Sequence, residues 1–248
     1  MVELNNIRFL FKQFTKVQLP NVTLIVIDCV NYKKAKRAFE HCRFLCDFGE
    51  AKILTHFDID DPFIVKIPKI SSINEYNTFV IKNLADYFAT EHVLIAQWDG
   101  YVWDAQMWTE DFLKYDYIGA PWRVDMLKTD IDETYLVGNG GFSLRSKKLQ
   151  TYLKNSTSEI TENEDVIICQ LRRSELEKQG FKYAPLDIAT KFSWEWAGNP
   201  GRAFGQHGHS GKIKALRQRW LNAYRATQLL RRLVSLNTPW NNKLPDNG

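Results

Sequence analysis

The chain has 248 residues, of which 44% are hydrophobic and 13% aromatic, and its formal net charge is +4. This composition predicts a soluble globular protein, and the absence of any uninterrupted apolar run of about 18 residues excludes a helix that spans a bilayer. Residues 1–16 do not resemble a signal peptide and the four cysteines show neither zinc spacing nor a disulfide framework, so we expect a cytoplasmic protein with reduced thiols.

Apolar, β-branched runs alternate with helical patterns over the first hundred residues. Residues 22–29 predict a strand and residues 33–48 a helix. Ser72, with Glu75 three residues later, is a capping pattern that predicts a helix over residues 72–89. Further strands are predicted at residues 51–56, 64–67 and 92–97. This alternation favours an α/β fold with a largely parallel, Rossmann-like sheet and helices on both faces.

The character of the sequence changes after residue 100, where aromatic residues become dense. We therefore place a boundary between two abutting halves there, 1–100 and 101–210. The second half predicts the following elements: strands at 117–118 and 135–144, a loop at 124–134, and helices at 146–154 and 162–177.

The positive charge belongs to the tail, residues 211–248. Residues 196–248 hold nine Lys or Arg against one acid, whereas the preceding residues carry four more acids than Lys and Arg. Apolar residues at helical spacing between the basic ones predict an amphipathic helix over residues 212–233. This helix either lies on an anionic membrane surface or packs on the protein body. The tail carries no nucleic-acid motif, so no nucleic-acid partner is expected.

Two aspartates follow predicted strands directly. Asp28 ends the first strand, and Asp99 follows the strand at residues 92–97. In parallel sheets ligands bind beyond the carboxyl ends of the strands, so both carboxylates are candidates for one ligand site. The alternative for Asp99 is a structural cap of the turn before Gly100.

A late histidine offers a nitrogen ligand for the same site. His207 stands in a short Gly-Gln-His-Gly segment, where the glycines allow close approach to a phosphate. Asp99 and His207 together suit Mn²⁺ or Mg²⁺, which take hard oxygen ligands and, for manganese, an imidazole. Such a cation stabilises the charge on a leaving diphosphate. A surface-loop histidine is the alternative.

Three glycines interrupt the predicted strand at residues 135–144. Gly138, Gly140 and Gly141 weaken a strand, so they indicate a close approach that side chains would block, such as a sugar ring against the backbone. The amide of Asn139 is a candidate for hydrogen bonds to sugar hydroxyls. A structural bulge is the alternative.

The acidic pair Glu164-Asp165 stands at a predicted helix start. There the helix dipole favours the ionised carboxylate, and an ionised carboxylate can accept the proton of an acceptor hydroxyl. Of the two, Asp165 is the preferred general base. Helix capping is the alternative.

In this order the motifs resemble the GT-A glycosyltransferase superfamily, and in particular glycosyltransferase-like proteins with the segments QxDG, DYIGAPW and GNGGFSLRS. The segments stand here at residues 97–100, 116–122 and 138–146. The resemblance, which covers residues 22–208, implies a GT-A fold and the following roles: Asp99 as the metal carboxylate, His207 as the late histidine of the metal site, Gly140 and Gly141 as the loop that contacts the sugars, and Asp165 as the base. With the residues singled out by position, the predicted donor site consists of Asp28, Gln97, Asp99, Asn139, Gly140 and Gly141, and the predicted catalytic pair of Asp165 and Glu164.

One departure concerns the metal. The first acid of the Asp-x-Asp pattern is Gln97 here, which brings no charge, so metal dependence is a weaker expectation than transfer itself.

The sequence thus predicts an inverting transferase that moves a sugar from a nucleotide-diphosphate donor, expected to be UDP-linked, to a glycan or lipid-linked acceptor in polysaccharide biosynthesis. The first half would bind the donor and the second the acceptor, with Trp122 and Trp194 as stacking platforms or, alternatively, core residues. A metal-dependent phosphoesterase using the same acids is one alternative function. The other is a non-catalytic module that binds glycan or membrane.

Overall fold

The computed structural model describes residues 16–123, 136–157, 159–195 and 202–208, which lie in one compact unit. Its main sheet has six strands in the order β3-β2-β1-β4-β7-β6. The strands are β1 (Val17–Ile27), β2 (Cys46–Thr55), β3 (Ile64–Lys66), β4 (His92–Ala96), β6 (Tyr117–Gly119) and β7 (Phe142–Ser146). Strands β3, β2, β1 and β4 are parallel, and β7 runs antiparallel to both of its neighbours.

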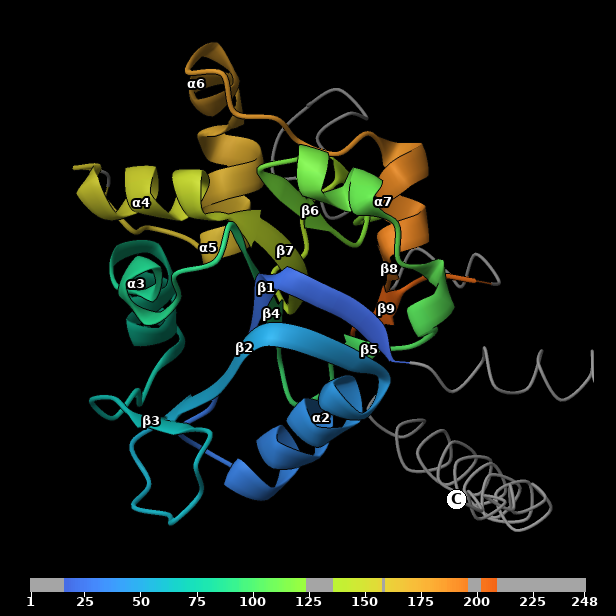
Figure 1. Cartoon of the computed structure of the whole chain (residues 1–248). Coiled ribbons are helices and arrows are strands. Elements are labelled where there is room, and N and C mark those ends of the chain that lie inside the picture. The colour runs from blue at the N-terminus through green and yellow to red at the C-terminus, as the bar shows by residue number, and fades with distance from the viewer. Residues whose placement is uncertain (1–15, 124–135, 158, 196–201, 209–248) are drawn as a thin grey trace, which may run out of the picture. The chain divides into compact units, whose positions relative to one another are not determined.

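Helices cover both faces of this sheet, as the sequence predicts (Figure 1). The helix α2 (Tyr32–Leu45) packs on β1 and β2 from one side. On the other side lie α3 (Ile73–Lys82), the 3₁₀ turn η1 (Leu84–Tyr87) and α4 (Lys147–Asn155). The α/β architecture is therefore confirmed.

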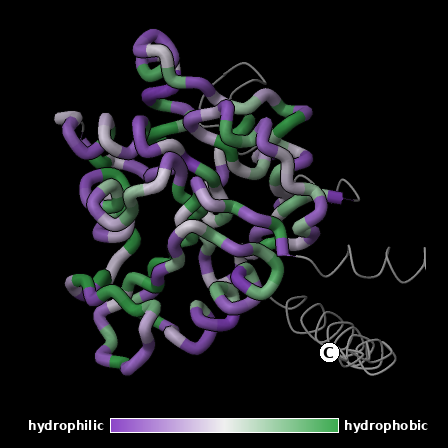
Figure 2. Tube along the Cα trace, viewed as in Figure 1, coloured by the Kyte–Doolittle hydropathy of each residue, from purple (hydrophilic) through white to green (hydrophobic). Residues whose placement is uncertain are grey.

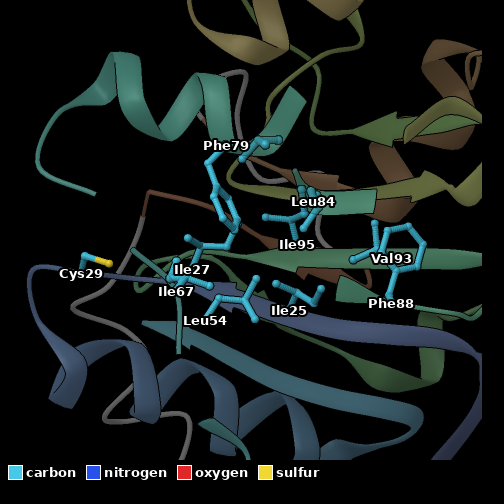
Figure 3. Close-up of a cluster of buried hydrophobic side chains, with 11 residues drawn as sticks. Ile25, Ile27, Cys29, Leu54, Ile67, Phe79, Leu84, Phe88, Val93 and Ile95 are labelled. Atoms are coloured by element: carbon cyan, nitrogen blue, oxygen red, sulfur yellow. The ribbon is translucent and has the colours of Figure 1, made fainter. Parts of the chain in front are cut away.

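The core on the α3 side joins the strands to that helix (Figure 3). Alternate residues of β1, Ile25 and Ile27, point into it beside Val93 and Ile95 of β4 and Phe79 of α3. This alternation is the period of a strand with a different neighbour on each face. Hydrophilic residues occupy the outer turns of the unit (Figure 2). Within the described ranges, no helix is long and apolar enough to cross a membrane.

The helix caps explain where two predicted helices begin. Asn31 accepts a hydrogen bond from the backbone N of Lys34 at 3.1 Å before α2, and Ser72 accepts one from Glu75 N at 3.2 Å before α3. The predicted cap at Ser72 is thus confirmed, but α3 ends at Lys82 rather than near residue 89. The chain continues there as η1, because Asn83 leaves the helical conformation at φ −120°.

The second half of the described chain has shorter elements than predicted. β7 begins only at Phe142, because the glycine segment before it is a loop. The helix predicted over residues 162–177 consists of α5 (Glu164–Val166), the π-helical turn η6 (Ile167–Leu171) and α6 (Arg173–Lys178).

A second, three-stranded sheet of very short strands has the order β5-β9-β8. Its strands are β5 (Tyr101–Val102), β8 (Ser193–Trp194) and β9 (Gly205–Gln206), and α7 (Leu186–Phe192) leads into β8. The main sheet takes strands from both sides of residue 100, and the boundary predicted there stays a prediction. The tail 211–248 and its basic helix over 212–233 lie outside the described residues.

Candidate functional site

The strand order reverses between β1 and β4, and there the ends of two parallel strands diverge. Such a switch point is where open α/β sheets bind ligands. A pocket of about 340 Å³ opens at this position. Asp28 follows β1 and Gln97 follows β4, and both line the pocket together with Tyr76 and Trp98. The sequence predicts Asp28 and Asp99 at this rim; Asp28 lines the pocket, whereas Asp99 does not, and a shared ligand site for the two stays a prediction.

Asp28 shapes the turn that leaves β1. Its Oδ1 accepts hydrogen bonds from the backbone N of Val30 at 2.7 Å and of Asn31 at 2.6 Å. Across the pocket wall, the Lys34 ammonium lies 4.3 Å from the centre of the Trp98 ring, which is 37% exposed. The pocket therefore offers a carboxylate, an aromatic ring and a nearby cation.

Gln97 connects this pocket to the late histidine. Its amide nitrogen donates to the Tyr76 hydroxyl at 3.2 Å, and its Oε1 lies 3.1 Å from Nε2 of His207. The same Nε2 is 3.4 Å from Oδ1 of Asp99. Residues 110 positions apart in the chain thus meet at one imidazole nitrogen.

The small sheet produces this meeting. Tyr101 of β5 pairs with Gln206 of β9, so Asp99, just before β5, lies beside His207, just after β9. The Gln206 side chain donates to the carbonyl of Asp99 at 2.9 Å, and the backbone N of His207 donates to the carbonyl of Trp194 at 3.1 Å.

Glu195, which the sequence analysis missed, completes the surroundings of His207. It follows β8, which runs parallel to β9, and its Oε1 lies 2.7 Å from Nδ1 of His207. Burial lowers the pKa of His207, but the ion pairs with Asp99 and Glu195 outweigh burial and raise it to about 9. No sequence motif identifies Glu195 as a site residue. The one signal is its position directly after β8, and that strand is too short to be predicted from sequence.

The glycine loop packs directly against these residues. A Cβ on Gly141 would lie 2.1 Å from Nε2 of His207, and a Cβ on Gly140 would lie 2.1 Å from Oε1 of Glu164. Neither glycine has a positive φ. The glycines are therefore needed for space, because protein side chains approach them closely; the predicted contact with a sugar ring stays a prediction.

Asp165 contacts the glycine loop at Gly140, the neighbour of the Gly141 against which His207 packs. Its Oδ2 accepts from the backbone N of Gly140 at 2.9 Å, and its Oδ1 accepts from Val166 N at 2.8 Å. Burial and the neighbouring charge of Glu164 raise the pKa of Asp165 to about 6. The carboxyl group is thus ionised at neutral pH and has a higher proton affinity than an ordinary aspartate.

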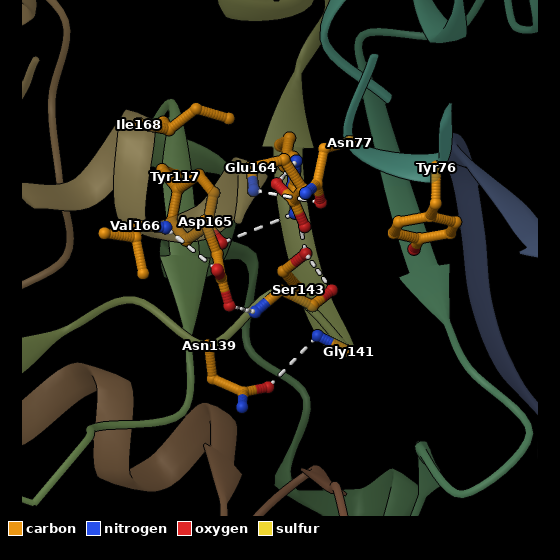
Figure 4. A network of polar contacts seen from close by, with 12 residues as sticks. Tyr76, Asn77, Tyr117, Asn139, Gly141, Ser143, Glu164, Asp165, Val166 and Ile168 are labelled. Carbon is orange, nitrogen blue, oxygen red and sulfur yellow. Dashed lines mark hydrogen bonds and ion pairs between the residues drawn. The ribbon is translucent and has the colours of Figure 1, made fainter. Parts of the chain in front are cut away.

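Glu164 points away from Asp165 into a buried polar network (Figure 4). Both of its oxygens accept from the Arg145 guanidinium, at 2.7 and 2.9 Å. Arg145 also donates to Ser143 Oγ at 3.0 Å, and Ser143 donates to the carbonyl of Gly140 at 3.0 Å. These contacts favour a supporting role beneath the loop, and the catalytic role predicted for Glu164 stays a prediction.

Replacing Glu164 with Ala should lower the free energy of unfolding by about 3–5 kcal/mol, because Arg145 would remain buried without a counter-charge. Urea unfolding measures this loss. Asp58→Ala is the matched control, since the Asp58 side chain is 94% exposed and pairs with Lys66, whose side chain is 64% exposed. A loss as small as that of the control would contradict the supporting role.

Both candidate stacking tryptophans are buried. Trp122 is 6% exposed and lies against Gly138, where an added Cβ would approach its ring to 2.1 Å. Trp194 is 4% exposed and meets Trp103 edge to face, with ring centres 5.8 Å apart. Acceptor binding by these rings stays a prediction.

Once the imidazole has released the proton that its raised pKa retains at neutral pH, the donor atoms near His207 fit a divalent cation. Oδ1 of Asp99 is buried and has no hydrogen-bond partner among the described residues, and Oε1 of Gln97 and Nε2 of His207 converge beside it. Spacings of 3.1 and 3.4 Å are close to those between neighbouring ligands of one ion at about 2.1 Å. The third ligand here is a glutamine. In the described parts of the chain, no group of three His, Cys, Asp or Glu residues could hold a metal ion.

The solved structures that are similar to the chain include the following three, each at 11% sequence identity. A glycosyltransferase involved in the glycosylation of the major capsid of PBCV-1 has a TM-score of 0.48, over 79% of this chain and 98% of that one. Bifunctional IspDF from Campylobacter jejuni has a TM-score of 0.42 (66% and 48%). Mannosyltransferase PcManGT from Pyrobaculum calidifontis, in complex with GDP-Man and Mn²⁺, has 0.43 (74% and 61%). These values are too low to assign an activity.

No curated protein sequence matches the chain. The model of one protein family, described as "Protein of unknown function (DUF5672)", matches residues 63–207. That range includes Gln97, the glycine loop and Asp165, and it ends at His207. The chain belongs to the DUF5672 family.

Proposed function

We propose that this protein is a glycosyltransferase that moves a sugar from a nucleotide-diphosphate donor to a glycan or lipid-linked saccharide. The proposal is carried by one observation: Gln97, Asp99 and His207 converge beside the glycine loop, next to a pocket at the switch point of the sheet. A phosphoesterase that cleaves simple esters would need only the polar cluster of Gln97, Asp99 and His207. The adjoining pocket adds room for a nucleoside.

The pocket between β1 and β4 would hold the nucleoside. Asp28 has the chemistry to accept hydrogen bonds from ribose or base, and the exposed Trp98 ring offers a stacking surface. Gln97 lines the pocket and connects it to the histidine, because its amide contacts both Tyr76 and His207. A bound donor would therefore direct its diphosphate toward Asp99 and His207.

Asp99, His207 and the carbonyl of Gln97 would hold a divalent cation such as Mn²⁺. When bound, the cation would stabilise the negative charge that develops on the leaving diphosphate. The chain's own contribution is to orient the three donor atoms, with Gly141 leaving space for the imidazole. Because Gln97 is neutral, we expect weaker metal binding than at a site with two carboxylates.

Asp165 would act as the general base of an inverting transfer. It contacts the glycine loop at Gly140, and the residue keeps some exposure to solvent, through which the acceptor hydroxyl would approach. The backbone N–H groups of Gly140 and Val166 fix the carboxylate. It would take the proton of the acceptor hydroxyl as the hydroxyl oxygen attacks the sugar and the diphosphate leaves.

The pH dependence of transfer follows from the pKa of about 6 for Asp165. The base works only when ionised, so kcat/KM should be level above about pH 7 and fall tenfold for each pH unit well below 6. A profile measured with a saturating second substrate tests this. A limb near pH 4, the range of an ordinary aspartate, would contradict the assignment.

A panel of donors tests the proposed function. The purified protein is incubated with UDP sugars and GDP-mannose, with oligosaccharide or lipid-linked acceptors, and with Mn²⁺, Mg²⁺ or chelator, while nucleotide release is measured. We expect release from at least one donor, faster with acceptor, and none from His207→Ala. Phosphate release from simple esters would instead favour a phosphoesterase, and glycan or vesicle binding without turnover a binding module.

The proposal extends to the cellular location of the enzyme and its attachment to a membrane. The protein would act in the cytoplasm, with the tail at residues 212–233 attaching it to an anionic membrane surface near its acceptor. Sedimentation with anionic vesicles, for the full chain and a chain that ends at Gly211, tests this. Equal sedimentation of the two would exclude the tail as the membrane contact.

A further inference from the structure

The two nitrogens of the His207 ring face different partners. Nδ1 lies 2.7 Å from Oε1 of Glu195, while Nε2 faces Gln97 at 3.1 Å and Asp99 at 3.4 Å. A carboxylate at one ring nitrogen fixes the orientation of the ring and decides which nitrogen is presented to a ligand. Glu195 is placed to have that effect on His207.

Glu195 is not placed to bind a ligand directly. It is 6% exposed and does not line the switch-point pocket. Its second oxygen, Oε2, accepts from the amide nitrogen of Asn139 at 2.5 Å. A buried carboxylate is costly unless it is paired and hydrogen-bonded. Here both oxygens are used, one by His207 and one by Asn139.

Asn139 extends the arrangement to the glycine loop. Its Oδ1 accepts from the backbone N of Gly141 at 3.1 Å, and Gly141 in turn lies against the His207 ring. Hydrogen bonds thus connect Gly141 to Asn139, Asn139 to Glu195 and Glu195 to His207. The His207 ring in turn packs against Gly141, which closes the ring of contacts. Both halves of the Asn139 amide are used within the protein, although the sequence predicts contacts to the sugar for it.

We propose that Glu195 and Asn139 are positioning residues, which hold the His207 imidazole with Nδ1 toward Glu195 and Nε2 toward Gln97 and Asp99. The metal part of this inference rests on the proposed function, whereas the orientation of the ring does not. A cation bound at Nε2 would then meet an imidazole that is already oriented, and the glycine loop would keep its place relative to that cation.

A polarity swap provides a sharp test. In Glu195→Gln, the side chain keeps one acceptor for two donors, so it can serve His207 or Asn139 but not both. In Asn139→Asp, two carboxylates face each other at the position of the 2.5 Å contact. In the double variant, the carboxylate introduced at position 139 accepts from the amide introduced at position 195, whose oxygen again accepts from His207. Glu177→Gln is the control for loss of an acid elsewhere.

Two readouts separate the inference from the proposed function. In the first, NMR of the ¹⁵N-histidine-labelled protein reports the hydrogen-bonded Nδ1 proton of His207, assigned by its absence in His207→Gln. In the second, electron paramagnetic resonance reports Mn²⁺ affinity. We expect each single variant to lose or shift the Nδ1 signal and to bind Mn²⁺ about 10–100-fold more weakly. The double variant should recover both, and Glu177→Gln should change neither.

An unchanged Nδ1 signal in both single variants would overturn the positioning role, whatever the activity of the enzyme. So would a double variant that is no better than either single one. If the wild-type protein binds no Mn²⁺, the metal part of the proposed function fails, and the Nδ1 signal with its recovery still decides the positioning role.

Discussion

Replacing Asp165 with Asn should lower kcat/KM for sugar transfer by at least about 10²-fold, the usual contribution of a general base. The carboxylate is the proposed proton acceptor beside Gly140, and the amide that replaces it cannot accept a proton. Donor affinity should stay within a few-fold of the wild-type value, because Asp165 does not line the switch-point pocket. Steady-state kinetics and a donor titration measure the two quantities.

The main complication is the contact between Asp165 and Gly140 N. The Asn amide can accept from Gly140 or from Val166 but not from both, so the loop could shift. The Nδ1 signal of His207 serves as a control for the loop, because Gly141 packs against that ring. Transfer at the wild-type rate, with that signal unchanged, would remove Asp165 as the base.

Gly141→Ala should reduce kcat/KM by about 10²-fold through geometry alone. The new Cβ would lie 2.1 Å from Nε2 of His207, so the imidazole must move away from Gln97 and Asp99. Displacement of a site group by about 1 Å can produce a loss of this size. Mn²⁺ affinity should fall in parallel, which a titration measures.

Gly180→Ala is the matched control for this substitution. No atom lies within 4 Å of its added Cβ, but its φ of +83° disfavours alanine. It should therefore cost stability, on the order of 1 kcal/mol, without affecting transfer. Wild-type Mn²⁺ affinity in Gly141→Ala would show that the position of the imidazole does not matter.

Local patterns sufficed to predict two residues of the switch-point pocket, Asp28 and Gln97. The continuous apolar run of β1 ends at Asp28, and the run of β4 ends at Gln97, so both strands and their rim residues follow from periodicity and from the rule for parallel sheets. The space-limited glycines were also predictable, because glycine within a strand pattern often marks a place where another group closely approaches the backbone.

The surroundings of His207 were not predictable in the same way. They depend on β5, β8 and β9, which have two residues each and no detectable period. Glu195 and Asn139 acquire their roles only when these strands pair. For Trp122 and Trp194 the difficulty is burial. The sequence alone does not distinguish an exposed aromatic residue, which could stack on a sugar, from a buried one, and both tryptophans are buried.

Calorimetric titration of the wild-type protein with nucleotide-diphosphate sugars, with Mn²⁺ present, tests the central claim most directly. We expect one site per chain for at least one donor, with affinity reduced at least tenfold by Asp28→Ala and by Asp99→Ala, and unchanged by Glu177→Gln. No binding of any nucleotide-diphosphate sugar, or binding that is indifferent to both aspartates, would contradict a glycosyltransferase site at the switch point.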